Sequence, residues 1–389
     1  MRRLGAIIGA AALLLSIGGA VALHVASNRD PLGEYSPPEG ALVTYLPARE
    51  DNQDLPLVIS GSIEAGFMRP FLLAFQRHNT RLSLVYIQSR NDALLERALW
   101  ACQQRERTAD IYLTSSTDHL VRLANENCAE TLPSALGQAA PAKASWRDQV
   151  VAFSVEPAVF VFSRELEGPL PPSHTALLDW LRALPRDRAR VGTYDIEMSA
   201  DGYDLAASDS NQDALYGRLL EGLGRSDIRL YCCSNVMVDA LDRREILFAY
   251  NVQLSYAYKA QRAGSRITVV LPDDYQALQT LSFMLPKHPR DPDMALKLAQ
   301  FLVSDEARAI ARRNLVPPGM PSDLATAQAD RLLAQASVTP LLLSLQDRAR
   351  REHLIREWRE AIAPAPNAAM SSLGPSRSPL LMPISAMMP

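Results

Sequence analysis

Short polar residues cluster at two points where we expect buried β-strands to end. Ser60, Gly61 and Ser62 follow one such strand, and Ser115 and Ser116 follow another. Serine hydroxyls can donate hydrogen bonds to a ligand, and a glycine lets the backbone approach it closely. N-capping of the next helix is the alternative role for either cluster. Because similar clusters follow two strands, the pattern favours ligand binding by Ser60, Ser62, Ser115 and Ser116.

A second set of candidate ligand-binding residues lies farther along the chain. Its members are Thr193, Tyr194, Asp195, Ser199, Asn251 and Tyr256. A tyrosine beside short polar residues at a strand end is typical of a water-filled cleft. Two other roles stay open, because Asp195 can hold a capped turn and the tyrosines can pack in the core.

Glu156 stands inside the apolar segment Gln149–Ser163. A carboxylate in apolar surroundings needs a partner, so it either pairs between two parts of the protein or touches a ligand. We favour the structural role.

Catalytic and metal-binding patterns are absent from the sequence. The six histidines are scattered, with no two at metal-ligand spacing on one helix. No G-x-S-x-G, Walker or G-x-G-x-x-G motif occurs. We therefore expect no enzymatic activity, no catalytic residue, no metal site and no cofactor. An exported hydrolase is the alternative, and it would turn over generic ester or phosphoester substrates.

Length and charge limit the possible functions. A chain of 389 residues exceeds the usual size of a single core, which predicts two lobes. The net charge of −3, from 40 basic and 43 acidic residues, gives no electrostatic reason to expect a nucleic-acid partner.

The N-terminus predicts export. Arg2 and Arg3 precede an apolar run over 4–23 that ends in small residues, the pattern of a secretory signal. The run is also long enough to span a bilayer, so residues 1–25 are either a signal peptide or a membrane anchor. In both cases we place the rest of the chain in the periplasm, with tethering by 4–23 as the open alternative.

The four cysteines fit an oxidising compartment without requiring it. Cys102 and Cys128 flank one expected strand and could form a disulfide, whereas neighbours such as Cys232 and Cys233 rarely pair. Small buried residues with free thiols are the alternative for all four.

The elements that must position these residues alternate between strand and helix patterns. Strands are expected over 55–60, 82–87 and 111–113, and Phe67, Phe71 and Phe75 recur at the period of a helix face. This order predicts an α/β fold with mostly parallel sheets and right-handed crossovers.

Two crossings predict a hinged, two-lobed architecture. Segment 149–163 is long for one strand and suits a passage from one lobe to the other, and 267–271 is expected to return to the first lobe. The predicted division is a linker over 26–54, a first lobe over 55–151 and 267–362, a second lobe over 152–266, and a disordered tail over 363–389.

Several segments resemble the exported solute-binding proteins of ABC transporters, in the type II periplasmic binding branch that includes ferric-ion, thiamine and phosphoglycerate-type receptors. They are Leu57–Phe75, Ala109–Ala129, Phe153–Ser163, Gly192–Tyr203, Leu230–Cys232, Tyr250–Ala257 and the turn Asp273–Tyr275. Ferric-binding members have adjacent tyrosines where this chain has Tyr256-Ala257, which argues against iron capture. The branch usually has Ser-Gly-x-Gly-Tyr where this chain reads Ser199-Ala200-Asp201-Gly202-Tyr203, so Asp201 weakens the case for anion binding there.

The resemblance implies capture of a small polar or anionic solute in the cleft between the lobes, and its delivery to an inner-membrane ABC permease. The alternative is a regulatory protein that presents its solute to a membrane sensor histidine kinase; an uncleaved N-terminal helix would favour it.

Overall fold

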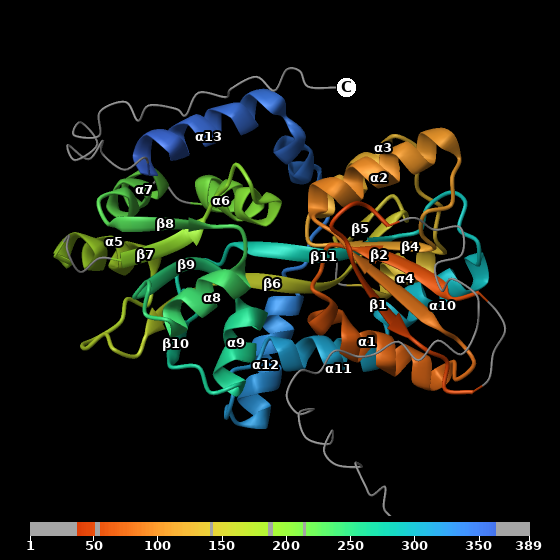
Figure 1. Cartoon of the computed structure of the whole chain (residues 1–389), viewed down its shortest axis with the longest axis horizontal. Coiled ribbons are helices and arrows are strands. Elements are labelled where there is room, and N and C mark those ends of the chain that lie inside the picture. Colours follow the sequence, from red (N-terminus) through yellow and green to blue (C-terminus); the bar gives the residue numbers. More distant parts are fainter. Residues whose placement is uncertain (1–36, 51–54, 141–142, 186–189, 213–214, 363–389) are drawn as a thin grey trace, which may run out of the picture.

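The computed structural model describes residues 37–50, 55–140, 143–185, 190–212 and 215–362. The expected leader over 1–25, most of the linker over 26–54 and the tail over 363–389 lie outside this part of the chain. A single mixed sheet runs through the molecule in the order β1-β3-β2-β4-β11-β6-β9-β7-β8, with helices on both faces (Figure 1). Within the described residues, no helix is both long and apolar enough to cross a membrane.

The first half of the sheet is built on parallel strands connected by helices. Its elements are β2 (Leu57–Gly61), α1 (Ala65–His78), β3 (Leu84–Gln88), α2 (Asn91–Gln104), β4 (Ile111–Thr114) and α3 (Thr117–Asn125). β2 pairs in parallel with β3 and β4. Because all three strands point the same way, their carboxyl ends and the following helix starts meet at one edge.

A strand inside the predicted linker belongs to this half. β1 (Leu42–Leu46) pairs antiparallel with β3, from Leu42 opposite Gln88 to Leu46 opposite Leu84. The linker prediction is therefore wrong for these residues: the exposed side chains of β1 hid the strand, because an edge strand buries little of its surface.

The longest strand, β6 (Val150–Ser163), is buried over its whole length and connects the two halves. Its residues 150–157 pair antiparallel with β11 (Leu278–Met284), and residues 158–162 pair antiparallel with β9 (Phe248–Gln253). The crossing predicted for 149–163 is thus present. The short β5 (Ser145–Trp146) precedes it and also pairs with it.

The second half surrounds the carboxyl end of β6. Its strands are β7 (Arg190–Tyr194), β8 (Asp227–Tyr231), β9 and β10 (Ile267–Val270), and its helices are α5 (His174–Ala183), α6 (Ala200–Gln212), α7 (Tyr216–Gly224), α8 (Ser234–Asp242) and α9 (Leu254–Arg262). β7 pairs in parallel with β8 and β9. The sheet is mixed overall because the crossing strands run antiparallel to their neighbours.

The returning strand is β11 and not β10. β10 pairs antiparallel with residues 160–163 of β6 and so stays in the second half, which corrects the return predicted for 267–271. β11 reaches β4 in the first half, with Ser282 opposite Thr114. The sequence Leu-Gln-Thr-Leu-Ser-Phe-Met over 278–284 does not alternate regularly between apolar and polar residues, so the sequence pattern does not predict this strand.

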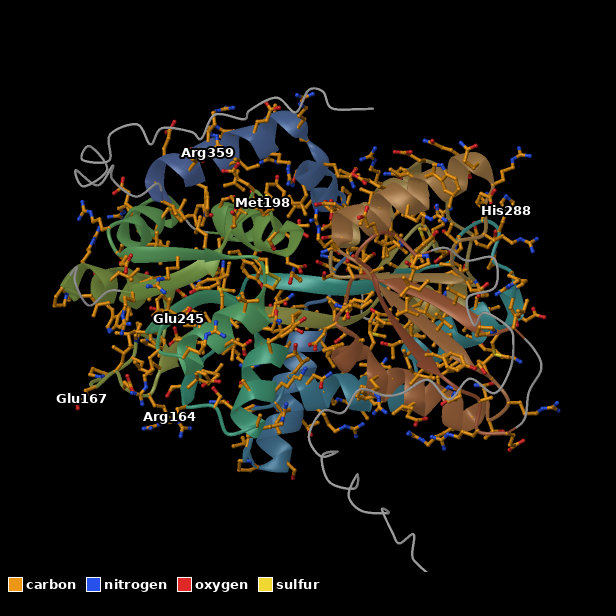
Figure 2. The ribbon with its side chains drawn as sticks, in the orientation of Figure 1. Arg164, Glu167, Met198, Glu245, His288 and Arg359 are labelled. Atoms are coloured by element: carbon orange, nitrogen blue, oxygen red, sulfur yellow. A yellow bond between two sulfur atoms is a disulfide. The ribbon has the colours of Figure 1, made fainter. Side chains whose placement is uncertain are left out.

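The C-terminal elements contact both halves. They are α10 (Pro292–Leu302), α11 (Asp305–Asn314), α12 (Ser322–Leu333), the 3-10 helix η1 (Pro340–Gln346) and α13 (Arg348–Ile362), while α4 (Ser134–Ala139) lies earlier in the chain. α10 and α11 pack on α1, and η1 packs on α3, but α13 packs on α7 (Figure 1). Arg359 of α13 also donates from Nε to Glu197 at 3.0 Å, on the side of the second half where Met198 is exposed (Figure 2). The predicted placement of α13 in the first lobe is therefore wrong.

Both cysteine pairs are bridged in the structure. The disulfide Cys102–Cys128 connects the end of α2 to the loop after α3. Of the two possibilities considered for this pair, a disulfide or free thiols, the structure has the disulfide. Cys232 and Cys233, between β8 and α8, also form a disulfide, contrary to the expectation that neighbours stay unpaired. Disulfides are typical of proteins that fold in oxidising compartments.

Candidate functional site

The carboxylate of Asp201 is the centre of a polar network between the two halves. Asp201 lies in the first turn of α6, in the second half. Its Oδ1 accepts hydrogen bonds from Ser115 Oγ at 2.7 Å, Gln279 Nε2 at 2.8 Å and Asn91 Nδ2 at 3.2 Å. Ser115 and Asn91 belong to the first half and Gln279 to the crossing strand β11. One side chain of the second half thus accepts hydrogen bonds from residues of the first half and of the crossing strand.

The donors around Asp201 are held in place by a chain of hydroxyl and amide groups. Ser62 donates to Thr114 at 2.9 Å, and Thr114 donates to Asn91 Oδ1 at 2.6 Å. Asn91 Nδ2 also lies 3.3 Å from Ser115 Oγ. Such a chain fixes the rotamers of its members, because each hydrogen bond restricts the next. Ser62 and Ser115, from the two predicted clusters, are therefore brought together.

Ser116 makes a second contact from the first half to α6. Its hydroxyl donates to Asp204 Oδ2 at 2.8 Å and makes no capping bond to α3, although Ser116 is the residue that precedes that helix. The Ser116 side chain therefore does not cap the N-terminus of α3. Ser60 is buried at the end of β2.

Two tyrosines from the second predicted set lie near the network. Tyr194 is bonded to Ser234 Oγ at 2.6 Å, and burial raises its pKa, as does the nearby charge of Asp201. Tyr256, in the first turns of α9, is partly exposed, and its pKa is raised well above the usual value by burial and then by the charges of Glu64 and Asp201. Both phenols are thus neutral at physiological pH and can donate hydrogen bonds.

The remaining candidates have local partners. Thr193 Oγ1 lies 3.5 Å from the Tyr250 carbonyl oxygen, and Asn251 Nδ2 donates to Asp209 Oδ2 at 2.7 Å inside the second half. Asp195 accepts from two backbone N–H groups of its own turn, and Ser199 caps α6 by accepting from the Gly202 N–H at 3.1 Å. These four residues shape the second half, and the structure does not bring them to the network.

Glu156 has a structural partner. Its Oε1 accepts from the Ser255 N–H at 2.7 Å, at the start of α9. Burial raises its pKa to about 7, and the charge of Asp201 adds to the shift. The side chain therefore ties β6 to α9.

Further contacts join the halves beside the network. Lys259 of α9 pairs with Glu64, before α1, at 2.9 Å. Gln253 of β9 donates to Gln279 of β11 at 2.6 Å. The halves are therefore in direct contact, and any opening between them must break these bonds.

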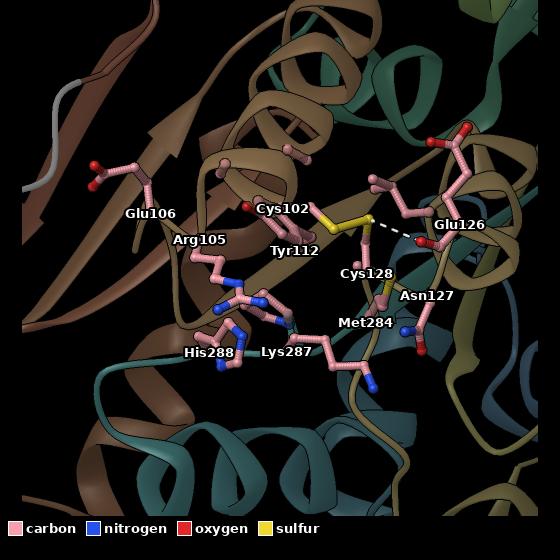
Figure 3. A pocket seen from close by; sticks show the side chains of 14 residues that line it. Cys102, Arg105, Glu106, Tyr112, Glu126, Asn127, Cys128, Met284, Lys287 and His288 are labelled. Carbon is pink, nitrogen blue, oxygen red and sulfur yellow. Dashed lines mark hydrogen bonds between the residues drawn. A yellow bond between two sulfur atoms is a disulfide. The ribbon is translucent and has the colours of Figure 1, made fainter.

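A cavity of about 280 Å³ adjoins the network. We call it the α3–α6 cavity, because the start of α3 and the residues of α6 from Asp204 onward line it; β11 and the segment 335–345 complete it. A second cavity, also of about 280 Å³, lies at the other end of the first half beside the Cys102–Cys128 disulfide, where Arg105 and Lys287 line it (Figure 3). The α3–α6 cavity has walls from both halves, whereas the second cavity lies within the first half.

The described residues contain no group of three or more His, Cys, Asp or Glu side chains placed to hold a metal ion. Ala257, which follows Tyr256, is fully buried. The adjacent tyrosine pair noted for ferric-binding members is therefore absent at positions 256 and 257.

Sequence reasoning missed several residues of the site. Asn91, Asp118, Asp204, Ser234, Gln253 and Gln279 were not among the candidates. Asn91 and Asp118 had a signal, since they lie in the first turns of helices that follow parallel strands. Asp204 and Gln279 had none, because α6 and β11 were themselves not predicted.

Comparison with known proteins places the fold. Residues 55–314 match the family described as bacterial extracellular solute-binding protein. A substrate-binding protein of an ABC transporter from Agrobacterium tumefaciens is 26% identical, with a TM-score of 0.74 over 84% of this chain and 100% of that one. No curated protein matches the chain.

Two more distant structures share the fold. Iron-bound HitA from Pseudomonas aeruginosa is 18% identical, with a TM-score of 0.59 over 78% of this chain and 99% of that one. AfuA from Actinobacillus pleuropneumoniae, solved with fructose-6-phosphate, is 15% identical, with a TM-score of 0.58 over 81% and 100%. The predicted type II periplasmic binding fold is confirmed by these matches.

Proposed function

Because this chain belongs to the bacterial extracellular solute-binding proteins, the non-enzymatic binding components of ABC transporters, we propose that it captures a small polar solute between its two lobes and delivers it to an inner-membrane permease. The two lobes are the two halves of the sheet, with β6 and β11 as the hinge. The family is extracellular, so the folded part acts after export; the periplasm is the proposed compartment.

The observation that supports the proposal best is the convergence of polar side chains from both lobes on Asp201. Ser115 and Asn91 of the first lobe reach Asp201 of the second, next to a cavity lined by both. A solute that contacts both lobes at once stabilises the closed arrangement by its differential affinity for that state. We propose Ser62, Ser115, Ser116, Tyr194 and Tyr256 as the predicted residues most directly involved.

The names of the structural relatives do not transfer their solutes to this chain. HitA is described as iron-bound and AfuA as binding fructose-6-phosphate. Here Ala257 replaces the second of two adjacent tyrosines, which disfavours iron, and Asp201 places a carboxylate at the centre of the network, which disfavours an anion beside it.

A thermal-shift screen tests the function. We expect at least one small polar metabolite to raise the melting temperature, since a ligand that binds only the folded state stabilises it by mass action. Tyr256→Ala should weaken that solute's binding by about tenfold, equal to ~1.4 kcal/mol.

Tyr45→Ala is the matched control, because Tyr45 is a partly exposed tyrosine on the edge strand β1. It should leave affinity unchanged. If a broad metabolite panel leaves both the melting temperature and the solution scattering curve unchanged, the function is wrong.

A further inference from the structure

The α3–α6 cavity has an unbalanced charge. Its lining consists mainly of hydroxyl and amide side chains, among them Ser208, Asn211 and Gln276, together with two carboxylates, Asp118 and Asp204. The described lining residues include no arginine, lysine or histidine. A cavity of this composition repels anions and attracts cations.

Asp118 lacks a complete set of partners. It is the second residue of α3, only 5% exposed, and its Oδ1 has no hydrogen-bond partner among the described residues. Its Oδ2 lies 3.9 Å from His119 Nε2, which is beyond hydrogen-bonding distance. An unsatisfied buried carboxylate oxygen costs free energy, so it needs a functional reason or a missing partner.

Asp204 faces the same space from α6. Its Oδ2 accepts from Ser116, and burial followed by the charge of Asp118 raises its pKa well above the usual value. Burial likewise raises the pKa of Asp118. The two carboxylates are therefore close enough to interact unfavourably when both are charged.

Besides His119, one arginine acts on both carboxylates, and it does not fill the cavity. Arg351 of α13 influences both carboxylates, but its guanidinium lies over the Tyr203 ring at 4.1 Å and Arg351 is not a lining residue. A positively charged group that entered the cavity would supply the charge and the N–H donors that the two carboxylates lack.

We propose that the α3–α6 cavity binds the positively charged nitrogen of a small polar solute, an amine or ammonium compound, with Asp118 of one lobe and Asp204 of the other as its anionic partners. The hydroxyl and amide groups bond to the rest of the solute. The inference rests on the proposed function and names its substrate class. The cavity volume is close to the lower limit of small-molecule sites, ~300 Å³.

Because the carboxylates come from different lobes, the amine would also hold the lobes together. Each lobe alone offers one negative charge, whereas the closed protein offers two to the same nitrogen. The solute therefore binds the closed state more tightly than the open one, which is the condition for ligand-driven closure.

Matched triads of probes test the solute class. Putrescine, 1,4-butanediol and succinate share a four-carbon chain, and glucosamine, glucose and glucose 6-phosphate share a ring, but each triad runs from cation to neutral molecule to anion. With the purified full chain at neutral pH, we expect the amine member of at least one triad to raise the melting temperature by about 2–4 °C or more, and the others to have no effect.

Variants identify the cavity as the origin of the shift. Asp204→Asn and Asp118→Asn should each weaken amine binding by about thirtyfold or more, since each removes a charge that contacts the ligand. Asp204→Asn should also raise the melting temperature of the unliganded protein, because it removes a carboxyl group whose charged form is disfavoured by burial and by Asp118. If Asp204 served stability alone, its replacement would instead lower the melting temperature of the unliganded protein. Asp179→Asn, at an exposed site on α5, is the control and should change neither property.

The outcomes separate the solute class from the function. Shifts caused only by neutral or anionic probes, and lost in Tyr256→Ala, overturn the amine proposal and keep the receptor. An amine shift that survives both aspartate variants overturns the assignment to this cavity. The absence of a shift from every probe overturns the amine proposal, and the wider metabolite screen then decides the function.

Discussion

At the scale of single residues, Glu156 shows how burial and charge combine in the crossing strand β6. Glu156 is 3% exposed, and its hydrogen bonding to Ser255 does not offset the loss of water around a charge. Its pKa therefore rises from 4.5 to about 7. In the folded protein Glu156 holds its proton more tightly than in the unfolded chain.

This shift predicts how stability depends on pH. Because the folded pKa is raised, the contribution of Glu156 to stability is fully present below pH 4.5 and is lost as the pH rises through about 7. Relative to Glu156→Gln, the free energy of unfolding of the wild type should fall by roughly 3 kcal/mol between these limits. Urea unfolding of both proteins across this range measures it.

Glutamine at position 156 keeps an oxygen that can accept the hydrogen bond from Ser255. The difference between the variant and the wild type therefore reports the effect of the carboxyl charge alone. Glu96→Gln, at an exposed position on α2, should follow the wild type. Parallel pH curves for wild type and Glu156→Gln would show that this carboxyl group is not shifted.

At the scale of elements, α6 is the helix on which the site depends. It carries Asp201 and Asp204, and its start is fixed by the cap from Ser199. Gly202 lets the helix lie directly on β7: a Cβ at this position would stand 2.5 Å from Tyr194 Cβ. The glycine thus determines how far α6 reaches toward the first lobe.

Gly202→Ala should therefore be destabilising although alanine favours helices. We expect a loss of ~1–3 kcal/mol, as for other overpacked cores, together with weaker solute binding as α6 shifts. Gly217 of α7 is the matched control, because a Cβ there meets nothing within 4 Å, and Gly217→Ala should leave stability equal or higher. Equal effects of the two changes on thermal unfolding would show that the close packing of α6 is unimportant.

At the scale of the whole molecule, the lobes are held together by a few polar contacts. Asp201 receives three of these hydrogen bonds, and Glu64–Lys259 adds an exposed ion pair. Exposed ion pairs contribute little, ~0–1 kcal/mol. Ser116 adds one hydrogen bond to Asp204, and the largest share of these hydrogen bonds belongs to Asp201. Removing it should favour the open arrangement without unfolding either lobe.

Asp201→Ala should give an unliganded protein with a larger radius of gyration by solution scattering. Asp242→Ala, which removes a carboxylate bonded to Ser265 on the outside of the second lobe, is the control and should scatter like the wild type. A radius of gyration unchanged by Asp201→Ala would mean that the contacts of β6, β11 and the C-terminal segment hold the lobes closed.

The C-terminal segment also restricts the opening of the two lobes, and its path between them was not predicted from the sequence pattern. η1 lies on α3 of the first lobe and α13 on α7 of the second, so the chain crosses from one lobe to the other on that side of the molecule. Gln346 bonds to the Asp118 backbone oxygen, and Arg359 bonds to Glu197. Closure and the position of this segment are therefore linked.

The sequence by itself determined the fold class, the crossing strand over 149–163 and the proximity of two serine-containing loops. These follow from local periods and from polar residues at strand ends, and Ser62 and Ser115 do converge. The site assignment as a whole remains a prediction that the experiments above test.

Only the tertiary structure decided which carboxylates face the cavity. Asp118 and Asp204 are 86 residues apart along the chain and lie on helices of different lobes, and no local pattern encodes a distance between them. The same holds for β11, whose partners are distant strands, and for Asn251, which the fold turns toward Asp209. Local sequence fixes backbone periods, whereas the environment of a charge depends on everything that packs around it.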